Sequence, residues 1–161
     1  MSKVNPIPEG YHSLTPFVVV DNAATAIDFY RAVFDAEVLS RNDAGDIVMH
    51  AELQIGDSIL QLSDPMPSMG LVPPDPDNVS ATLVLYVEDV DTVVGKAVEA
   101  GATLREEISE FVTGDRFGSI VDPFGRRWAV MTRVKDVPRG EAERLVNEWI
   151  ASMAKGEADE T

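Results

Sequence analysis

The stretch Ser13-Leu14-Thr15-Pro16-Phe17-Val18-Val19-Val20-Asp21 decides the fold, because a second stretch, Ala81-Thr82-Leu83-Val84-Leu85-Tyr86-Val87-Glu88-Asp89, repeats its pattern. Each is a short, β-branched, apolar run that predicts a buried strand, and a helical run follows each of them. In the aligned copies Thr15 meets Thr82, and further along Gln61 meets Ala129. A unit of this length that occurs only twice predicts two equivalent modules rather than a solenoid.

The first module is expected over about residues 13–63, in the order β-α-β-β-β. Its helix starts near Asn22 and carries apolar residues at helical spacing, namely Ala26, Ile27, Tyr30, Val33 and Phe34. After the strand over 13–20, further strands are expected at 38–41, 47–54 and 58–63, the last two joined through Gly56.

The second module is expected over about 81–133. We predict a strand at 81–87, a helix at 90–100, and strands at 102–106, 108–112, 116–121 and 127–133. The five prolines in residues 64–80 predict a linker without regular structure between the modules. After Pro138 an amphipathic helix is expected at 140–154, so the chain divides into a domain of residues 1–137 and a helical tail of residues 138–161.

Composition excludes several classes of function. The net charge of −15 disfavours nucleic acid as a partner and favours a cationic ligand, although plain solubility explains the charge as well. The absence of cysteine excludes disulfides, thiolate metal sites and cysteine nucleophiles. The sequence contains no run of eighteen apolar residues, which would predict a membrane span. Its first residues do not resemble a signal peptide, so we expect a cytoplasmic protein.

Several motifs resemble one family. Asn22 through Phe29-Tyr30 with Phe34-Asp35-Ala36-Glu37, then Leu85 to Asp91, and Asp122-Pro123-Phe124-Gly125-Arg126-Arg127-Trp128 are similar to signatures of the vicinal oxygen chelate superfamily of glyoxalases, bleomycin-resistance proteins and dioxygenases. With Pro8 to His12 and Met49 to Glu52, the chain looks most like the PhnB-like branch. The resemblance implies an α+β fold in which two tandem βαβββ modules form a curled mixed sheet around a U-shaped cavity, here with an added C-terminal helix.

The resemblance also implies where a metal would bind. In metal-dependent members the first and last strands of each module supply the ligands, and the motifs place these four slots at Thr15, Gln61, Thr82 and Ala129. Two hydroxyls, an amide and a methyl group contain no anionic donor to offset the dehydration of a cation. We therefore expect no metal and no cofactor, and no catalytic residue is assigned. His12 and His50 are more simply interpreted as structural or surface residues, and Glu52 shares a strand face with His50 without an evident third ligand.

The alternation of side chains along a strand predicts which further residues face the cavity. The expected ligand-binding residues are Thr15, Phe17, Gln61, Thr82, Tyr86, Arg127, Ala129 and Met131, while the opposite set, with Leu14, Leu60 and Trp128 among it, packs under the helices. Arg127 should lie at the rim or meet an anionic group, because burying it without a partner is costly.

Three functions remain. The first is a metal-free protein that sequesters a small, aromatic or cationic molecule in the cavity, and we expect such a protein to be a homodimer. The second is a metal-dependent lyase, isomerase or dioxygenase of the same superfamily. The third is an interaction protein that uses the tail helix.

Overall fold

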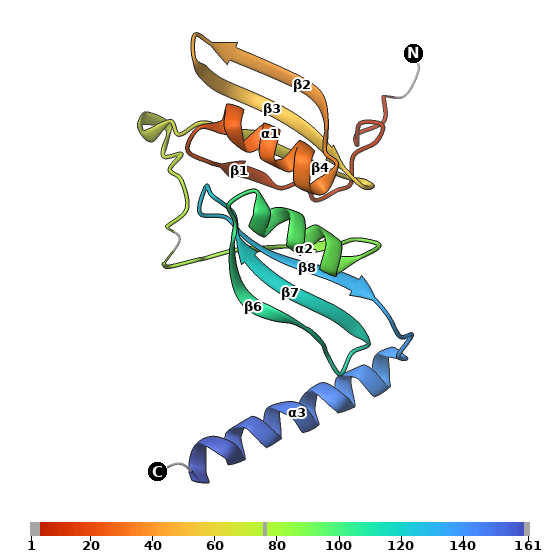
Figure 1. The fold of residues 1–161 in the computed structure, drawn as a ribbon. Coiled ribbons are helices and arrows are strands. Elements are labelled where there is room, and N and C mark those ends of the chain that lie inside the picture. Colours follow the sequence, from red (N-terminus) through yellow and green to blue (C-terminus); the bar gives the residue numbers. More distant parts are fainter. Residues whose placement is uncertain (1–3, 76, 160–161) are drawn as a thin grey trace.

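The computed structural model describes residues 4–75 and 77–159 and contains two βαβββ modules followed by a long helix (Figure 1). Module one consists of β1 (Phe17–Val19), α1 (Ala23–Phe34), β2 (Glu37–Ala44), β3 (Ile47–Ile55) and β4 (Ser58–Ser63). Its four-stranded sheet has the order β1-β4-β3-β2, and β1 runs parallel to β4. Between the modules lies a short 3-10 helix, Pro67–Met69, in the segment for which no regular structure was predicted.

Module two repeats this topology. It consists of β5 (Thr82–Tyr86), α2 (Val90–Glu99), β6 (Thr103–Glu110), β7 (Asp115–Val121) and β8 (Arg127–Arg133), with the sheet order β5-β8-β7-β6. The register confirms the alignment made from the sequence: Phe17 pairs with Gln61 in one sheet and Val84 pairs with Ala129 in the other. The helix α3 (Arg139–Asp159) follows, and none of the described helices is long and apolar enough to cross a membrane.

Local chemistry explains where the helices begin. The Asn22 side chain accepts a hydrogen bond from the Thr25 N–H at the start of α1, and Asp89 accepts bonds from the Asp91 and Thr92 N–H groups at the start of α2. Asp35 ends α1 in the left-handed conformation, with φ of 53°. The helix expected from near Asn22 is confirmed as α1 and the helix predicted at 90–100 is confirmed as α2, while the helix predicted at 140–154 extends further, to Asp159, as α3.

Two expectations about strands were wrong. The strand predicted over 13–20 is limited to Phe17–Val19, because Pro16 has no N–H to donate, and Leu14 is 86% exposed rather than packed under the helices. The strands predicted at 102–106 and 108–112 are one strand, β6. Its pairing with β7 shifts register on both sides of Glu106, and such bulges interrupt the alternation by which a strand is recognised.

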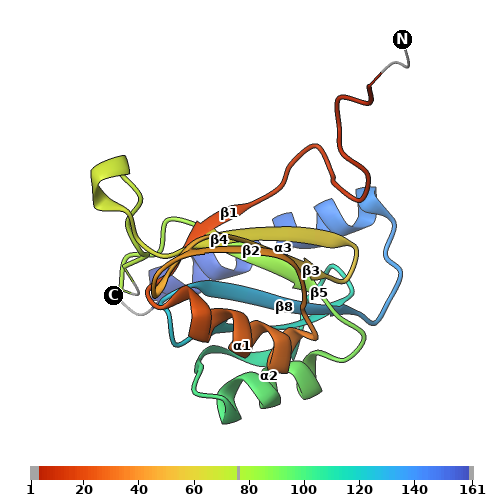
Figure 2. The same ribbon diagram turned by 90° about the horizontal axis from the view of Figure 1, so that it is seen from above.

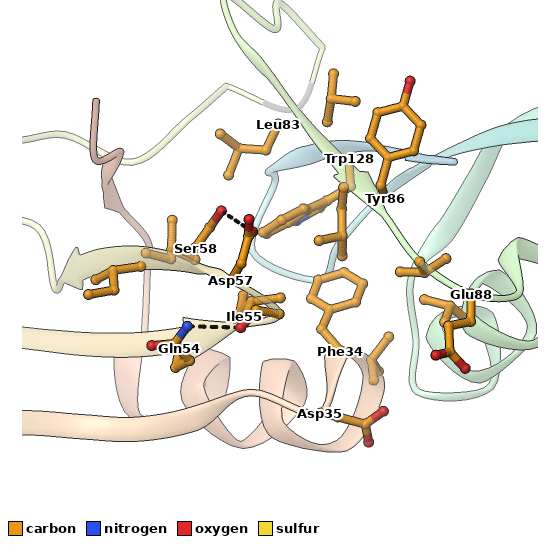
Figure 3. A pocket seen from close by; sticks show the side chains of 18 of the residues that line it. Phe34, Asp35, Gln54, Ile55, Asp57, Ser58, Leu83, Tyr86, Glu88 and Trp128 are labelled. Carbon is orange, nitrogen blue, oxygen red and sulfur yellow. Dashed lines mark hydrogen bonds between the residues drawn. The ribbon is translucent and has the colours of Figure 1, made fainter. Parts of the chain in front are cut away.

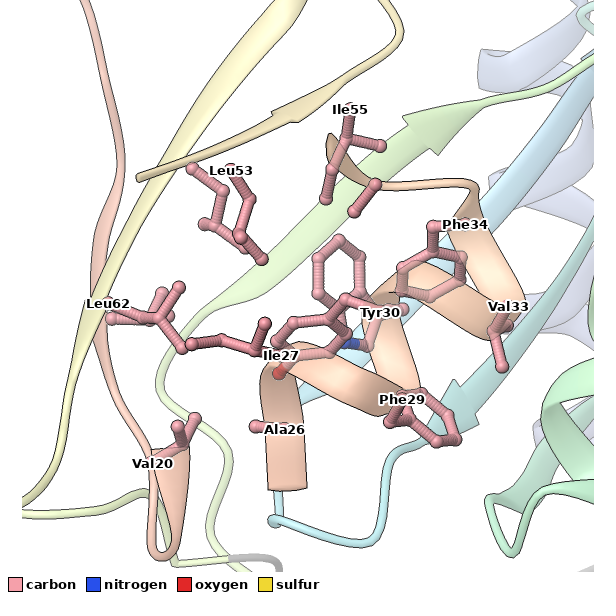
Figure 4. Packing of buried hydrophobic residues seen from close by; sticks show 14 of the residues in the cluster. Val20, Ala26, Ile27, Phe29, Tyr30, Val33, Phe34, Leu53, Ile55 and Leu62 are labelled. Carbon is pink, nitrogen blue, oxygen red and sulfur yellow. The ribbon is translucent and has the colours of Figure 1, made fainter. Parts of the chain in front are cut away.

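The helices α1 and α2 lie on one side of the two sheets, and α3 lies on the other (Figure 2). We call the sheet side turned away from α1 and α2 the open face. The main hydrophobic core lies under α1 and includes Tyr30, Leu53 and Leu62, each less than 2% exposed (Figure 4). The same cluster includes Trp128 and Val130 of module two, so one core joins the modules.

Candidate ligand-binding site

One corner of the junction between the modules is filled by aromatic side chains. Trp128 of β8 lies 4.6 Å from Phe34 and 5.4 Å from Tyr30, measured between ring centroids. Phe124 closes the same corner against Tyr30 at 6.3 Å. We call this group of four aromatic residues the closed corner; their rings pack against one another and fill the space between them.

A buried carboxylate fixes the closed corner. Asp122, 3% exposed, accepts hydrogen bonds from Tyr30 Oη at 2.8 Å, from Trp128 Nε1 at 2.9 Å, and from the backbone N–H groups of Arg126 and Phe124 at 2.8 and 3.0 Å. Burial raises the pKa of Asp122, and these hydrogen bonds oppose the rise without cancelling it. The Asp122-Pro123-Phe124-Gly125 turn thus attaches module two to the helix of module one.

The opposite corner has the same topology but smaller side chains. The strand registers make Leu60 the counterpart of Trp128, and the two helix caps, Asn22 and Asp89, make Ala97 the counterpart of Tyr30. Leu60 lines the cleft, and a leucine there cannot fill the space that Trp128 occupies at the closed corner. The second corner therefore remains open.

A cleft of about 1530 Å³ occupies this open corner (Figure 3). It lies between the β3–β4 hairpin, the strand β5 and the first turns of α2, and the segment His12 to Pro16 borders it. Its wall is mainly apolar and aromatic, and includes Phe34, Ile55, Leu60, Leu83, Leu85, Val93 and Trp128. The apolar and aromatic wall is typical of a small-molecule site, and the volume exceeds the roughly 300–1,000 Å³ of most such sites.

The polar groups around the cleft are mostly acidic. Its lining includes five carboxylates and two cationic groups, namely those of Asp35, Glu37, Asp57, Glu88 and Asp89, and those of Lys96 and Arg133. None of the five carboxylates has an oppositely charged partner within 4.0 Å among the residues that the structure describes, whereas Arg133 pairs with Asp115. The cleft therefore presents a net negative charge, which attracts cations.

The predicted site residues divide between the cleft and the open face. Thr15 and Tyr86 line the cleft. The other six do not line it and lie on two different sheets: Phe17 and Gln61 on module one, and Thr82, Arg127, Ala129 and Met131 on module two. The structure does not bring these six together around one described cavity.

On the open face of module one, Glu52 occupies the position next to Gln61. Its carboxylate accepts hydrogen bonds from Tyr11 Oη at 2.5 Å, Gln61 Nε2 at 3.0 Å and Ser40 Oγ at 3.2 Å. The bond from Tyr11 is the main reason that the pKa of Glu52 is lowered, and the same bond is the main reason that the pKa of Tyr11 is raised. Both groups therefore keep their usual neutral-pH forms, a carboxylate and a phenol.

On the open face of module two, Arg127 meets an acid, as expected. Its Nη2 lies 2.6 Å from Glu106 Oε2, which also accepts a hydrogen bond from Ser119 Oγ at 2.5 Å. The bonds from Ser119 and Arg127 lower the pKa of Glu106. Tyr86 lies nearby on β5, and burial and the charge of Asp115 raise the pKa of its phenol.

The four metal slots do not fit a metal ion. Thr15, Thr82 and Ala129 offer no anionic or imidazole donor, and the amide nitrogen of Gln61 donates to Glu52. Over residues 4–75 and 77–159, no three His, Cys, Asp or Glu side chains come close enough together to hold one. The donor chemistry thus disagrees with the metal site that the fold would otherwise imply.

Three important residues were not among those predicted for the site. Phe34 and Trp128 were assigned to the core, and they do line the cleft from the core side. Glu52 was set aside because no third ligand was evident. The alignment of the repeats contained a usable signal, since it pairs Trp128 with Leu60 and so reveals a difference in volume.

Comparison with known proteins identifies the family. Residues 11–130 match the family model of the Glyoxalase/Bleomycin resistance protein/Dioxygenase superfamily. Uncharacterised proteins of Mycobacterium tuberculosis and Mycobacterium bovis are 37% identical over 140 residues, which is 84% of this chain and 82% and 92% of theirs.

Solved structures show the same fold. A gene product of Arabidopsis thaliana is 25% identical with a TM-score of 0.62, over 74% of this chain and 98% of that one. The PhnB protein of Bacillus cereus, described as a putative 3-demethylubiquinone-9 3-methyltransferase, is 19% identical with a TM-score of 0.60, over 75% of this chain and 99% of that one. The chain thus belongs to the glyoxalase, bleomycin resistance protein and dioxygenase superfamily, with PhnB-like and glyoxalase proteins among its structural neighbours.

Proposed function

We propose that the chain is a metal-free binding protein that sequesters a small aromatic or cationic molecule in the cleft between its modules. The observation that carries this proposal is the open corner, where small side chains replace the aromatic residues of the closed corner and leave about 1530 Å³. The aromatic wall, with Phe34 and Trp128, favours a flat ligand, because ring stacking adds to the burial of apolar area.

The charge of the cleft supports a cationic group on that ligand. Five carboxylates and two cationic groups line the cleft, and the whole chain carries a net charge of −15. Electrostatic attraction of this kind raises the rate of association and weakens with added salt. Binding requires no step that a metal would perform.

Trp128 is a built-in reporter of the cleft. The chain has two tryptophans, so Trp149→Phe leaves Trp128 alone. We expect proflavine, a planar cationic dye, to quench its emission saturably. Val93→Phe on the cleft wall should weaken this quenching at least tenfold, and Val98→Phe, an exposed position of the same helix, should leave it unchanged. Equal quenching in both variants, or no saturable quenching by any planar cation, would reject the proposal.

We also propose that the chain forms a homodimer, because apolar side chains of α3 and of β5 remain exposed in the described part of the chain. Trp149, Ile150 and Met153 are 41%, 51% and 52% exposed, and Val84 and Tyr86 of β5 are 57% and 58% exposed. Exposed apolar surfaces of this kind commonly mark protein contacts. Light scattering should show a dimer, which Ile150→Glu or deletion of residues 138–161 converts to a monomer, whereas Asn147→Glu on the same helix leaves the dimer intact. A monomeric wild type would refute this part.

A further inference from the structure

The two modules carry the same pair of residue types, serine and glutamate, with the members exchanged. Glu52 pairs with Gln61 and Ser119 pairs with Ala129, so Glu52 and Ser119 are counterparts. Across the next strand Ser40 pairs with Glu52 and Glu106 pairs with Ser119. Each open face therefore presents one carboxylate that accepts a hydrogen bond from a serine across the strand.

Only one of these carboxylates has a cationic partner. Arg127 neutralises Glu106 at 2.6 Å, and the strand registers give Ile59 as the counterpart of Arg127 in module one. An isoleucine cannot neutralise a carboxylate. No ion pair within 4.0 Å involves Glu52 anywhere in the described part of the chain.

The surroundings of Glu52 hold the carboxylate in place and leave its charge uncompensated. Its three hydrogen-bond donors, Tyr11, Gln61 and Ser40, are all neutral groups. Oε1 accepts two of these bonds and Oε2 accepts one. A carboxylate oxygen has two lone pairs, so Oε2 retains capacity for one further donor.

Aromatic rings stand beside this carboxylate. Phe17, the strand neighbour of Gln61, stacks on His50 with ring centroids 6.0 Å apart and an interplanar angle of 26°. Phe17 is 42% exposed, and the Tyr11 ring lies at the carboxylate itself through its hydrogen bond. A fixed carboxylate next to accessible aromatic faces is the combination that recognises organic cations, since the rings attract the cation through their negative faces.

We propose that Glu52, with Phe17 and Tyr11, forms a binding site for a small organic ammonium ion on the open face of module one. This site is separate from the cleft, because Tyr11, Phe17, His50, Glu52 and Gln61 do not line the cleft. The ammonium N–H donates to Glu52 Oε2, and the aromatic rings cover the carbon atoms of the ion. In module two the equivalent carboxylate, that of Glu106, is already paired with Arg127 and cannot serve as such a site.

The structure provides a matched control for this proposal. Benzylammonium is titrated by calorimetry into the wild type, Glu52→Gln and Glu106→Gln, all on a Val93→Phe background that blocks the cleft. We expect Glu52→Gln to weaken binding at least tenfold and Glu106→Gln to change it less than twofold. Equal effects of the two variants, or an unchanged affinity in Glu52→Gln, would overturn the proposal.

A second variant tests the site by copying the arrangement of module two. Ile59→Arg places a guanidinium in the position that corresponds to Arg127 and should abolish benzylammonium binding in protein that retains the wild-type thermal transition. Tight binding by folded Ile59→Arg protein would count against the proposal. Because Ile59 itself lines the cleft, Trp128 quenching is measured on Glu52→Gln protein without the Val93→Phe change, in which the cleft wall is unaltered; failure at Glu52 and failure of the proposed function are therefore distinguishable. If Ile59→Arg does not fold, the pair of glutamine variants decides.

Discussion

The phenol of Tyr30 in module one donates a hydrogen bond of 2.8 Å to the carboxylate of Asp122 in module two, across 92 positions of the chain. Both residues are buried, at 0% and 3% exposure. This bond connects the helix of one repeat to the last turn of the other, and burial and the charge of Asp122 raise the pKa of Tyr30 well above its ordinary value. The phenol is therefore a permanent donor over the working pH range of the protein.

Removing that donor should destabilise the whole fold. Tyr30→Phe leaves the buried Asp122 carboxylate with one partner fewer, at a cost of about 1–3 kcal/mol in the free energy of unfolding. Tyr86→Phe is the matched control, because Tyr86 is 58% exposed and its hydrogen bond to Asp115 is long, at 3.4 Å. Urea denaturation of both variants tests this, and equal losses would contradict the role given to Tyr30.

The pH dependence of stability should change when Asp122 is made neutral. Burial raises the pKa of Asp122, so folding favours its protonated form, and its contribution to stability falls as pH rises through the folded pKa. The wild type should therefore lose stability relative to Asp122→Asn as pH rises from the ordinary carboxyl pKa through the raised pKa of the folded state, and denaturation curves at a series of pH values would measure this loss.

The contribution of Glu106 to stability should have the opposite dependence on pH. Hydrogen bonds from Ser119 and Arg127 lower its pKa, so its contribution is present above the unfolded pKa and is lost as pH falls. The wild type should gain stability relative to Glu106→Gln as pH rises over the acidic range. Denaturation curves at a series of pH values would give the two slopes, and slopes of equal sign would show that one assignment is wrong.

Copying the open corner into the closed one should open a second cavity. Trp128→Leu installs the residue of the counterpart position, removes the ring that packs on Phe34, and removes a hydrogen bond to Asp122. We expect a loss of about 2–4 kcal/mol, from the cavity and the unpaired carboxylate. Trp149→Leu, at a position 41% exposed, should cost well under half as much in the same urea titration. Similar losses would exclude Trp128 as the main contact between the modules.

Gly114 is a position at which the structure tolerates only glycine. Its φ is +88°, and a Cβ there would lie 2.3 Å from the carbonyl oxygen of Lys135. Gly114→Ala should therefore destabilise the fold by at least about 2 kcal/mol more than Gly45→Ala, because Gly45 shares the positive φ, +63°, but has nothing within 4 Å. Thermal unfolding of both variants separates the steric clash from the backbone strain that they share. Equal midpoints would show that the β6–β7 turn yields to the extra methyl group.

The sequence predicts the fold to a large extent because the two copies constrain each other. Side chains alternate with a period of two along a strand, so aligning Thr15 with Thr82 also fixes which residues face the helices. This is why Leu60, Leu62, Trp128 and Val130 are found in the core as expected. The rule failed for Leu14 because β1 begins only after Pro16. The strand β6 was predicted as two strands because bulges interrupt its alternation.

The site could be predicted only in part, for a physical reason. Periodicity tells which face a side chain occupies, and the cost of burying an unpaired charge gave an acidic partner as one of two expectations for Arg127. A cleft between two modules depends instead on volumes contributed by separate segments, and no single segment reveals that Leu60 leaves space unfilled. Glu52 was recognisable as a carboxylate in a strand, whereas its bonds to Tyr11 and Ser40 depend on how the N-terminal arm and β2 lie.

The unequal corners have an evolutionary consequence. Aromatic residues and one buried carboxylate hold the modules together at the closed corner. Substitutions at the open corner can therefore change recognition without loss of that contact. Leu60, Leu83 and Val93 are thus the positions at which descendants of this chain could acquire new ligands while keeping the same scaffold.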